Sequence, residues 1–320
     1  MPTVEDVRAA ASRIGGAVRR TPSWSSERLD DALGCSVVLK CENLQRAGAF
    51  KIRGATNAIR ALVASGPEVR GIAAHSSGNH AQAVALAARE HGLPAAILMP
   101  ADAPEEKLAA TRAYGAEVVL YDRYREERTT LAEGLAEERG FALIPPYEHP
   151  DVIAGQGTAT LELLADAGAL DALVVPVGGG GLLAGAALVA EAEAPSMRLV
   201  GVEPEVADDA RRSLEAGSIV ELPTAPTICD GQQAPIGELT FAVIAPRVER
   251  IVTVPDDDVR ATMRLLFEAA KLVTEPSGAC GLAGLRRSID ELELRDARVG
   301  VILSGGNVSV GRFAALTGPT

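Results

Sequence analysis

A lysine in an apolar, glycine-bearing segment is the first candidate for chemistry in this sequence. The chain has four lysines, and Lys51 stands between Phe50 and Ile52 in the segment Gly48–Ala55. A strand is expected to end near Glu42 and a helix to begin near Lys51, so the helix macrodipole would disfavour a positive charge there. Burial beside Phe50 would also favour the neutral amine, which can form a Schiff base. A solvated lysine that caps a turn is an equally weighted alternative.

A polar cluster stands where a predicted strand over Gly71–His75 meets the next helix. The cluster comprises Ser76, Ser77, Asn79 and His80. Free backbone N–H groups at a helix N-terminus favour an anion such as a substrate carboxylate. Helix capping would explain one such residue, because Ser and Asn are preferred N-caps, but it does not explain the whole group.

Four consecutive glycines, Gly178–Gly181, end the most apolar predicted strand. Because glycine has no Cβ, the backbone amides there can close around a phosphate at the start of the next helix. A dinucleotide site uses a spaced G-x-G-x-x-G with an acidic residue about twenty positions later. Glu203 lies at about that distance, so an oxidoreductase that binds a dinucleotide stays open as a weaker alternative. The uninterrupted tetraglycine favours a monophosphate.

A fourth segment, Leu303–Asn307, again follows a predicted strand. The hydroxyl of Ser304 could hydrogen-bond a ring nitrogen. The two glycines after it would let a ring approach the backbone closely. By itself, this segment is more typical of an ordinary turn.

Short apolar runs alternate with longer helical patterns along nearly the whole chain, which predicts parallel sheets with helices on both faces. The predicted strands are Ser36–Cys41, Gly71–His75, Ala95–Met99, Glu117–Tyr121, Ala172–Val177, Arg198–Glu203 and Arg298–Leu303. The predicted helices include Ala81–His91, Glu105–Tyr114, Leu161–Ala167 and Leu182–Ala192. A proline-rich break over residues 145–150 separates two blocks, and residues 223–235 form a long loop of a kind that is often functional. Ligands in such folds bind at the C-terminal ends of the strands.

Composition argues against several classes of protein. The 320 residues are 47% hydrophobic and 23% charged, which is typical of a globular protein with about two domains. A net charge of −12 argues against nucleic acid or an anionic membrane as the main partner. The sequence shows no export signal, no apolar run long enough to span a bilayer and no CxxC pair among its four cysteines. We therefore expect a cytoplasmic protein with reduced thiols.

Together, the four segments resemble the fold-type-II pyridoxal-phosphate enzymes, in particular the serine racemase and serine/threonine dehydratase family. The likeness runs from about residue 4 to residue 310, and the motifs occur in the family's order. It implies an α/β protein of two doubly wound open-sheet domains, similar to tryptophan synthase β, with pyridoxal 5′-phosphate in the cleft between them. The large domain would comprise residues 1–71 and 148–320, and the small domain residues 72–147.

The resemblance implies how the cofactor would be bound. Lys51 would hold it covalently, Phe50 would pack on its ring and Asn79 would hydrogen-bond its 3-oxygen. Ser304 would face the pyridine nitrogen, and Glu275 in its Glu-Pro turn would lie beside the cofactor or in a supporting position. The phosphate would be bound by the glycine loop and the residue after it, namely Gly178, Gly179, Gly180, Gly181 and Leu182.

The resemblance also implies how the substrate would be bound. The turn that contains Ser76, Ser77, Asn79 and His80 would surround the substrate carboxylate. Ser77 stands where racemases of the family have a serine as the acid and base on the face of Cα opposite the lysine, so racemisation is compatible with the sequence. Tyr147 falls where family members place a residue over the active site, and it could either select the substrate side chain or simply pack.

The resemblance implies an ammonia-lyase (dehydratase). It would convert L-serine, L-threonine or another β-hydroxy amino acid, 3-hydroxyaspartate included, to a 2-oxo acid and ammonia. Lys51 would act as the base at Cα. A serine opposite the ring nitrogen cannot keep that nitrogen protonated as a carboxylate would, which favours elimination over transamination. The alternative is a serine, hydroxyaspartate or aspartate racemase with dehydratase side activity, and a more remote one is a non-catalytic binding protein that retains the fold.

The segment Gly201–Asp209 resembles the divalent-cation site of the racemase-like members. Glu203, the Ala207 carbonyl and Asp209 would supply oxygen ligands that suit Mg²⁺ or Ca²⁺, with water in the remaining positions. Without the resemblance, the aspartates are more simply explained as negative charge at a helix N-terminus. The resemblance also implies a homodimer that acts on a small amino acid.

Overall fold

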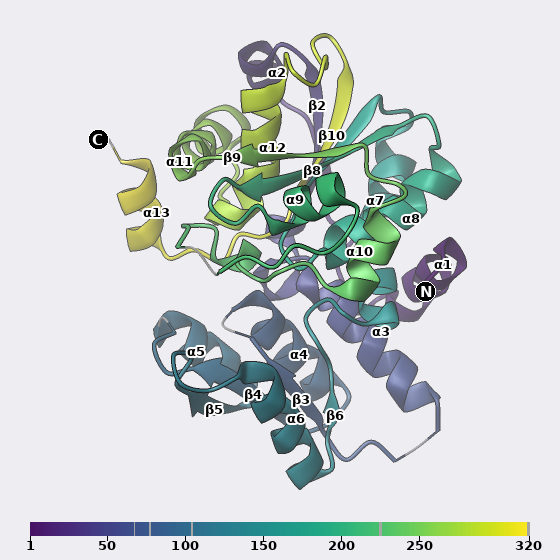
Figure 1. Cartoon of the computed structure of the whole chain (residues 1–320), viewed down its shortest axis with the longest axis vertical. Coiled ribbons are helices and arrows are strands. Elements are labelled where there is room, and N and C mark those ends of the chain that lie inside the picture. The colour runs from purple at the N-terminus through teal and green to yellow at the C-terminus, as the bar shows by residue number, and fades with distance from the viewer. Residues whose placement is uncertain (67, 77, 104, 224–225, 319–320) are drawn as a thin grey trace.

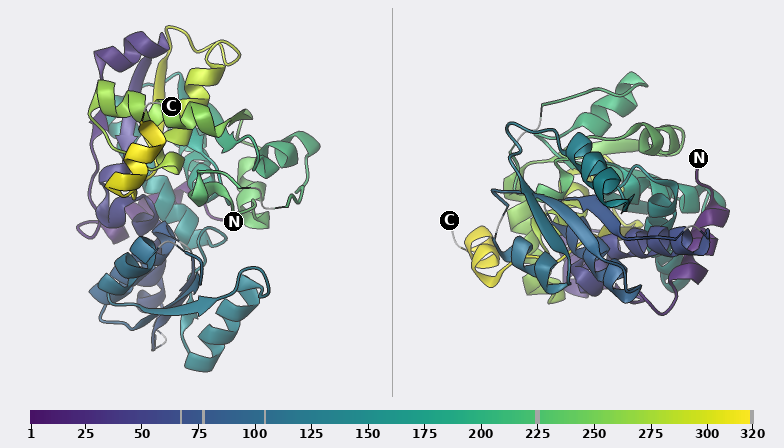
Figure 2. Two further views of the ribbon diagram at one scale, coloured as in Figure 1. Left: turned by 90° about the vertical axis from the view of Figure 1, so that its left-hand side faces the viewer. Right: turned by 90° about the horizontal axis from the view of Figure 1, so that it is seen from below.

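The computed structural model describes residues 1–66, 68–76, 78–103, 105–223 and 226–318. The strands in these ranges form two separate sheets, a larger one in the upper part of Figure 1 and a smaller one in the lower part. The chain enters the small sheet once and then returns to the large sheet. The side view in Figure 2 shows the two parts stacked along the long axis of the molecule.

The large sheet, as far as the structure is described, has six strands in the order β1-β2-β10-β7-β8-β9. All neighbouring strands are parallel except β1 and β2. Buried aliphatic residues fill the central strands, as expected where helices cover both faces of a parallel sheet. The strands are β1 (Ser23–Trp24), β2 (Ser36–Cys41), β7 (Ala172–Pro176), β8 (Arg198–Pro204), β9 (Arg250–Val254) and β10 (Arg298–Leu303).

Two hydrophobic cores form on the two faces of the large sheet. One core contains residues of α2 (Glu27–Leu33), α11 (Asp256–Leu265) and α12 (Pro276–Ser288), with Phe313 of α13 (Val310–Thr317) packed against it. The other core contains residues of five helices, α1 (Val4–Ile14), α7 (Pro150–Ala167), α8 (Gly181–Glu193), α9 (Asp209–Ala216) and α10 (Glu238–Ile244). The large sheet is therefore doubly wound, as the sequence predicts.

The small sheet has four parallel strands within the described ranges, in the order β5-β4-β3-β6. They are β3 (Ile72–His75), β4 (Ala95–Pro100), β5 (Glu117–Tyr121) and β6 (Ala142–Leu143), and they pack with α4 (Asn79–Glu90), α5 (Glu105–Ala113) and α6 (Arg128–Arg139). Ile52 and Ile59 of α3 (Lys51–Ala64) belong to the core of the small sheet. The predicted domain limits at residues 71 and 148 stay a prediction.

The α/β fold class is confirmed, and every predicted strand occurs. Three of them, over residues 36–41, 117–121 and 298–303, have the predicted limits. Strands β1, β6 and β9 were not predicted, and helix α7 begins at Pro150 rather than near Leu161. Its glycines are close-packing positions, because a Cβ on Gly155 would lie 2.6 Å from Cα of Gly54 in α3. None of the helices in the described ranges is long and apolar enough to cross a membrane.

Candidate active site

A cavity of about 970 Å³ is lined by residues of both sheets. From the small sheet, the last residues of β3, β4 and β5 face it, namely His75, Pro100 and Tyr121. From the large sheet, Pro176 at the end of β7 and Ser304 after β10 face it. The cavity thus lies at the C-terminal ends of parallel strands, where ligands bind in α/β folds. All four chemically promising segments of the sequence contribute residues to it.

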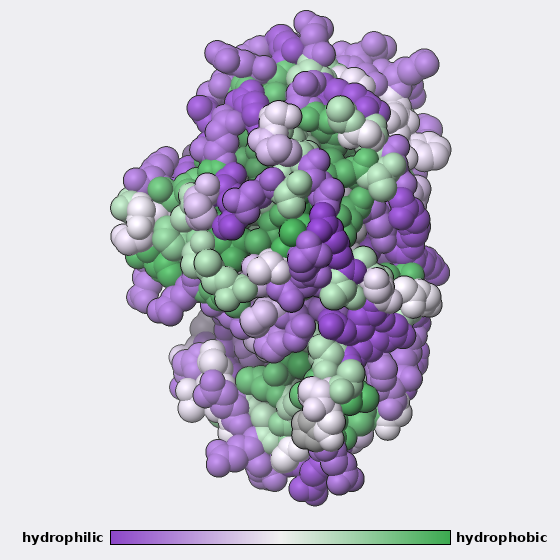
Figure 3. Space-filling view, turned by 90° about the vertical axis from the view of Figure 1, so that its right-hand side faces the viewer, coloured by the Kyte–Doolittle hydropathy of each residue, from purple (hydrophilic) through white to green (hydrophobic). Residues whose placement is uncertain are grey.

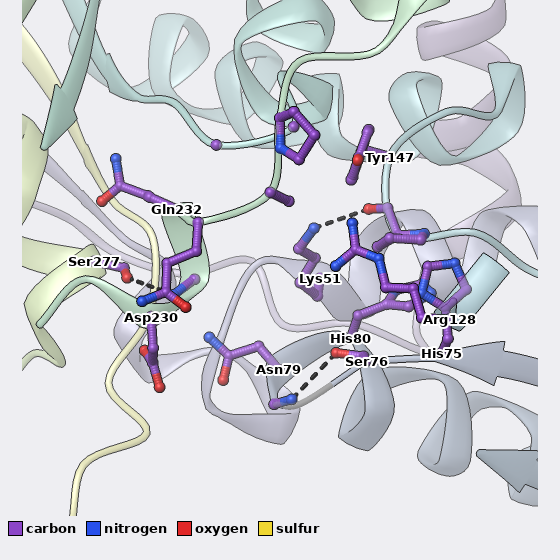
Figure 4. Close-up of a pocket in the computed structure, with 18 of the residues that line it drawn as sticks. Lys51, His75, Ser76, Asn79, His80, Arg128, Tyr147, Asp230, Gln232 and Ser277 are labelled. Carbon is purple, nitrogen blue, oxygen red and sulfur yellow. Dashed lines mark hydrogen bonds between the residues drawn. The ribbon is translucent and has the colours of Figure 1, made fainter. Parts of the chain in front are cut away.

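Lys51 lies near the centre of the cavity drawn in Figure 4. It is the first residue of α3, as the sequence predicts. Its Nζ donates a hydrogen bond of 2.8 Å to the Pro146 carbonyl and lies 5.2 Å from the centroid of the Phe50 ring. Desolvation by burial lowers the pKa of Lys51 to about 8. A fraction of this amine is therefore uncharged near neutral pH, which is the form that attacks a carbonyl carbon.

Asn79, the first residue of α4, has its side-chain amide held from two sides. Its Nδ2 donates to Glu275 Oε1 over 2.5 Å, and its Oδ1 accepts from Asn307 Nδ2 over 2.9 Å. Glu275 is buried, and desolvation together with the charge of Asp230 raises its pKa to about 7, although Lys107 and Asn79 oppose the rise. Because an amide nitrogen carries two hydrogens, Asn79 can donate one further hydrogen bond into the cavity.

Two histidines line the same side of the cavity. Nε2 of His80 lies 2.9 Å from the Ile144 carbonyl, which can only accept, so Nε2 carries the proton and Nδ1 is an acceptor. Desolvation lowers the pKa of His80 to about 3 and that of His75 to about 4, so both rings are neutral at pH 7. Nδ1 of His80 is buried and has no hydrogen-bond partner in the described structure, so a ligand could donate to it.

The serines predicted to bind the cofactor and the substrate have different surroundings. Ser76 lines the cavity, and its Oγ accepts from the Gly78 amide over 3.2 Å. Ser77, the expected acid and base, lies outside the described residues. Ser304 also lines the cavity, and its hydroxyl donates to the Ser277 carbonyl over 3.2 Å. The lone pairs of the Ser304 oxygen can still accept a hydrogen bond.

The tetraglycine loop before and at the start of α8 has no room for side chains. A Cβ on Gly179 would lie 2.4 Å from the ring of Tyr147, and a Cβ on Gly180 would lie 2.9 Å from Cβ of Thr240. Gly180 has a φ of +86°, which residues with a side chain rarely adopt. The loop and Leu182 line the cavity, so the first backbone amides of α8 are close to any ligand there. This geometry fits a phosphate group.

An ion pair that the sequence analysis missed joins the two parts of the molecule at the cavity. Lys107 of α5 pairs with Asp230, which lies in the loop between α9 and α10. Both side chains line the cavity. The sequence indicated a functional loop over residues 223–235, of which 224 and 225 lie outside the described residues, but it gave no indication of the partner in α5.

Arg128 is a second cavity residue that the sequence analysis missed. Figure 4 shows its side chain on the same side of Lys51 as His75 and His80. The neighbouring Arg123 pairs with Asp102 over 2.7 Å. Arg128, in contrast, takes part in none of the ion pairs found among the described residues, which leaves its guanidinium for a ligand. In the sequence it is one of many arginines in a charged stretch.

The residues predicted to bind a divalent cation lie away from the cavity, at the end of β8 and the start of α9. The two carboxylate oxygens of Glu203 accept from the amides of Ala210 and Arg211 over 3.1 Å and 2.8 Å. Oδ2 of Asp209 accepts from the Ile236 amide over 2.7 Å. Each carboxylate is therefore held by backbone amides of this region.

Glu203 and Asp209 behave as buried acids without a basic partner among the described side chains. Desolvation raises the pKa of both Glu203 and Asp209, and the charge of Asp209 adds to the rise at Glu203. No basic side chain in the described ranges forms an ion pair with either of them, because Arg211 and Arg212 pair with Asp208. The described residues contain no group of three or more His, Cys, Asp or Glu side chains arranged for a metal. A cation here would also need backbone carbonyl and water ligands.

Comparison with known proteins agrees with this arrangement. The chain is 50% identical over 317 residues to the L-threo-3-hydroxyaspartate ammonia-lyase of Saccharomyces cerevisiae, covering 99% of this chain and 96% of that protein. It is 44% identical over 315 residues to the serine racemase of Schizosaccharomyces pombe, covering 98% and 97%. The structure of maize serine racemase matches with a TM-score of 0.92 at 41% identity, covering 97% and 95%. Since a family model described as "Pyridoxal-phosphate dependent enzyme" matches residues 14–305, the chain belongs to this family of pyridoxal-phosphate-dependent enzymes.

Proposed function

We propose that this protein is a pyridoxal-phosphate-dependent ammonia-lyase that converts 3-hydroxyaspartate to a 2-oxo acid and ammonia. The observation that carries the proposal is that Lys51 and Arg128 face one cavity. The first offers an amine for the cofactor, and the second offers a cation for the second carboxylate of the substrate. The 50% identity to a hydroxyaspartate ammonia-lyase over nearly the whole chain supports the same choice.

The residues around Lys51 fit the cofactor. When bound, pyridoxal phosphate disperses negative charge from the substrate Cα. Lys51, whose pKa is lowered to about 8, is suited to accept a proton from Cα. Asn79 can donate its second amide hydrogen to the ring 3-oxygen, Phe50 and Ser304 can contact the ring, and the amides over Gly178–Leu182 can bind the phosphate. Glu275 lines the same cavity and accepts a hydrogen bond from Asn79, so it can hold the Asn79 amide towards the cofactor.

The substrate α-carboxylate would bind at the start of α4. The N-terminal amides of α4 follow Gly78, which caps the helix without a side chain. His80 is neutral and offers only an acceptor at Nδ1, so it can accept from another group of the substrate but does not itself bind the carboxylate. Ser76 lines the cavity beside this helix and can donate its hydroxyl to the same carboxylate. Tyr147 packs its ring across Gly179, so it bounds the cavity as a wall residue.

Arg128 distinguishes between the candidate substrates. A guanidinium can bind a carboxylate through two parallel hydrogen bonds. The side chain of 3-hydroxyaspartate contains such a carboxylate, whereas the side chains of serine and threonine do not. An arginine without an acidic partner at the cavity wall therefore favours a dicarboxylic substrate.

The test is a comparison of substrates on the purified enzyme. L-serine, L-threonine and the diastereomers of 3-hydroxyaspartate are each assayed for 2-oxo acid and ammonia. We expect the highest kcat/KM for a 3-hydroxyaspartate diastereomer. In Arg128→Met, this kcat/KM should fall by about 10- to 100-fold, the equivalent of a charged hydrogen bond, while turnover of L-serine changes little. The matched control, Arg128→Lys, should retain part of the activity.

Release of 2-oxo acid from L-serine but not from any 3-hydroxyaspartate diastereomer would contradict the proposed substrate. Serine racemisation is the second candidate function, and the 44% identity to a serine racemase favours it. Formation of D-serine from L-serine is measured in the same incubations. D-serine without pyruvate would make the racemase the better assignment.

We also propose that Glu203, the Ala207 carbonyl and Asp209 bind a divalent cation, Mg²⁺ or Ca²⁺. Two buried carboxylates without a basic partner among the described side chains support this site. Oxygen ligands of this type suit both ions. The site lies outside the cavity, so the cation would stabilise the fold and would not contact the substrate.

We further propose a cytoplasmic homodimer. Large hydrophobic side chains are half exposed near the hydrogen bond from the Asn43 side-chain amide to the Val273 carbonyl, where Leu44 is 43% and Val273 is 42% exposed. On the face drawn in Figure 3, hydrophobic patches are interrupted by hydrophilic residues. A particle with the mass of one chain in size-exclusion chromatography with light scattering would contradict the dimer.

The proposed cytoplasmic location rests on the cysteines. All four cysteines are free and buried, which fits a reducing compartment.

A further inference from the structure

We infer that Thr240 and Glu148, neither of which lines the cavity, hold the tetraglycine loop in the conformation that binds the cofactor phosphate. The inference rests on the proposed role of this loop as the phosphate site. It makes Thr240 a positioning residue that acts through the backbone of Gly179 and Gly180. It also makes Glu148 the residue that connects this loop to the segment beside Lys51.

Thr240, in α10, is fully buried against the loop. Its Oγ1 lies 2.9 Å from the Gly179 carbonyl, 3.0 Å from Glu148 Oε1 and 3.1 Å from the Gly237 carbonyl, and it accepts from the Gly237 amide over 3.1 Å. The Gly179 carbonyl therefore points towards α10. In a trans peptide the carbonyl and the following N–H point in opposite directions, so this contact turns the Gly180 amide away from α10.

Gly180 adds a steric part to the same contact. A Cβ on Gly180 would lie 2.9 Å from Cβ of Thr240, so the loop backbone lies directly on the threonine side chain. The positive φ of Gly180 is needed for this approach. A hydroxyl group and a close backbone contact thus define the orientation of one peptide of the loop.

Glu148 connects this contact to the other side of the cavity. Its Oε1 accepts from the Thr240 amide and its Oε2 from the Leu239 amide, each over 3.0 Å. The carboxylate fills the space where Gly237 has no side chain, since a Cβ there would lie 2.0 Å from Cδ of Glu148. The next residue towards the N-terminus is Tyr147, whose ring covers Gly179.

The segment 146–148 therefore contacts three parts of the site in succession. The Pro146 carbonyl accepts from Lys51, Tyr147 packs on the loop, and Glu148 binds α10. Because these contacts are consecutive in the chain, the position of the phosphate loop relative to Lys51 is fixed through Glu148 and Thr240. Loss of the Thr240 hydroxyl should weaken binding of the phosphate and leave binding of the ring unchanged.

The test compares two ligands that differ only in the phosphate. Apoenzyme is titrated with pyridoxal 5′-phosphate and, separately, with pyridoxal, and each Kd is measured from the absorbance of the bound chromophore. Thr240→Val keeps the shape of the side chain and removes the hydroxyl. We expect a Kd for pyridoxal phosphate about tenfold higher than in the wild type, the effect of one buried hydrogen bond, and less than a twofold change for pyridoxal.

Thr240→Ser is the matched control, because it retains the hydroxyl and should bind pyridoxal phosphate nearly as the wild type does. Equal affinity of wild type and Thr240→Val for pyridoxal phosphate would overturn the inference, and so would an equal loss for both ligands. If Thr240→Val does not fold, Glu148→Gln is judged by the same two affinities. Failure of the wild-type apoenzyme to bind pyridoxal phosphate would instead overturn the proposed function.

Discussion

The chain buries acidic side chains both behind Lys51 and at the end of β8, and basic partners surround only the first group. The first group, here called the Arg53 cluster, comprises Lys40, Glu42, Arg53 and Glu162. Arg53 donates two hydrogen bonds of 2.8 Å to Glu42 and binds the two oxygens of Glu162 over 2.8 Å and 2.7 Å. Lys40 pairs with Glu162 over 2.7 Å.

The second group, here called the β8 carboxylates, comprises Glu203 and Asp209. Its carboxylates accept only from backbone amides in the described structure. The consequences for the pKa values are opposite. At Glu42, desolvation alone would raise the pKa, but the charge and hydrogen bonds of Arg53, with Thr21 and Lys40, lower it below its usual value. At Glu203, desolvation prevails and the pKa is raised.

The difference shows that burial of an acid does not by itself identify its role. In the Arg53 cluster, each buried charge has a partner from another element, and Arg53 stands two residues after Lys51 in α3. This cluster therefore fixes the start of the helix that presents Lys51. The β8 carboxylates lack such a partner among the described side chains, so a cation from solution is the partner that would stabilise them.

The largest effect is expected from breaking the Arg53 cluster. Glu42→Gln leaves Arg53 buried with one of its two carboxylates removed, and loss of one partner from a buried pair costs about 3–5 kcal/mol of stability. The free energy of unfolding is measured by urea denaturation. Glu249→Gln is the control, because the Arg198–Glu249 pair is only half buried and should contribute less than about 1 kcal/mol. Similar losses in the two variants would contradict the structural role of the cluster.

An intermediate effect is expected when a cation is offered to the β8 carboxylates. Mg²⁺ or Ca²⁺ at about 100 times its Kd should stabilise the protein by about 2.7 kcal/mol, and a chelator should reverse the increase in Tm. Asp209→Asn should abolish the shift because it removes a ligand. Asp208→Asn should preserve it, because Arg211 and Arg212 already neutralise Asp208. If the cation raised the Tm of Asp209→Asn as much as that of the wild type, the ion would bind at another site.

Much of the fold could be predicted because its strands are buried on both faces. The run over residues 36–41 is apolar enough to be recognised as a buried strand, and its observed limits equal the predicted ones. Helix α7 was predicted too short, because Gly155 and Gly157 are typical of a break when their packing partners are unknown. Those partners, Gly54 and Gly185, lie in other helices. Close packing between distant glycines is a tertiary effect that local sequence does not show.

The candidate site also contains residues that local sequence could predict and residues that it could not. Asn79, Ser304 and the tetraglycine loop stand at or shortly after the ends of strands, and Lys51 begins the helix that follows β2, so chain order indicated that they would meet. The residues that form ion pairs in and behind the site were not predicted, because the role of each depends on the oppositely charged residue beside it. Lys107 and Asp230 are 123 residues apart, and Arg53 and Glu162 are 109 apart. Nothing in one sequence shows which acidic residue lies beside which basic one.

The smallest effect is expected in the pH dependence of the Arg53 cluster. The folded-state pKa of Glu42 is lower than its usual value of 4.5. The stability that its ionised form contributes is therefore fully present above that usual value and is lost as the pH falls through the lower folded value.

The free energy difference between the wild type and Glu42→Gln should accordingly be constant from about pH 7 to about pH 5 and should narrow at lower pH. This change cannot exceed the cost of the substitution itself, and it stays below that cost as long as Glu42 is only partly protonated at the lowest pH tested. Urea denaturation of both proteins from about pH 7 to below pH 5 measures the free energy difference. A difference that widens as the pH falls would show that Glu42 has a raised pKa, like Glu203. The two groups of buried acids would then be alike in kind, and pairing with Arg53 would not determine the charge state of Glu42.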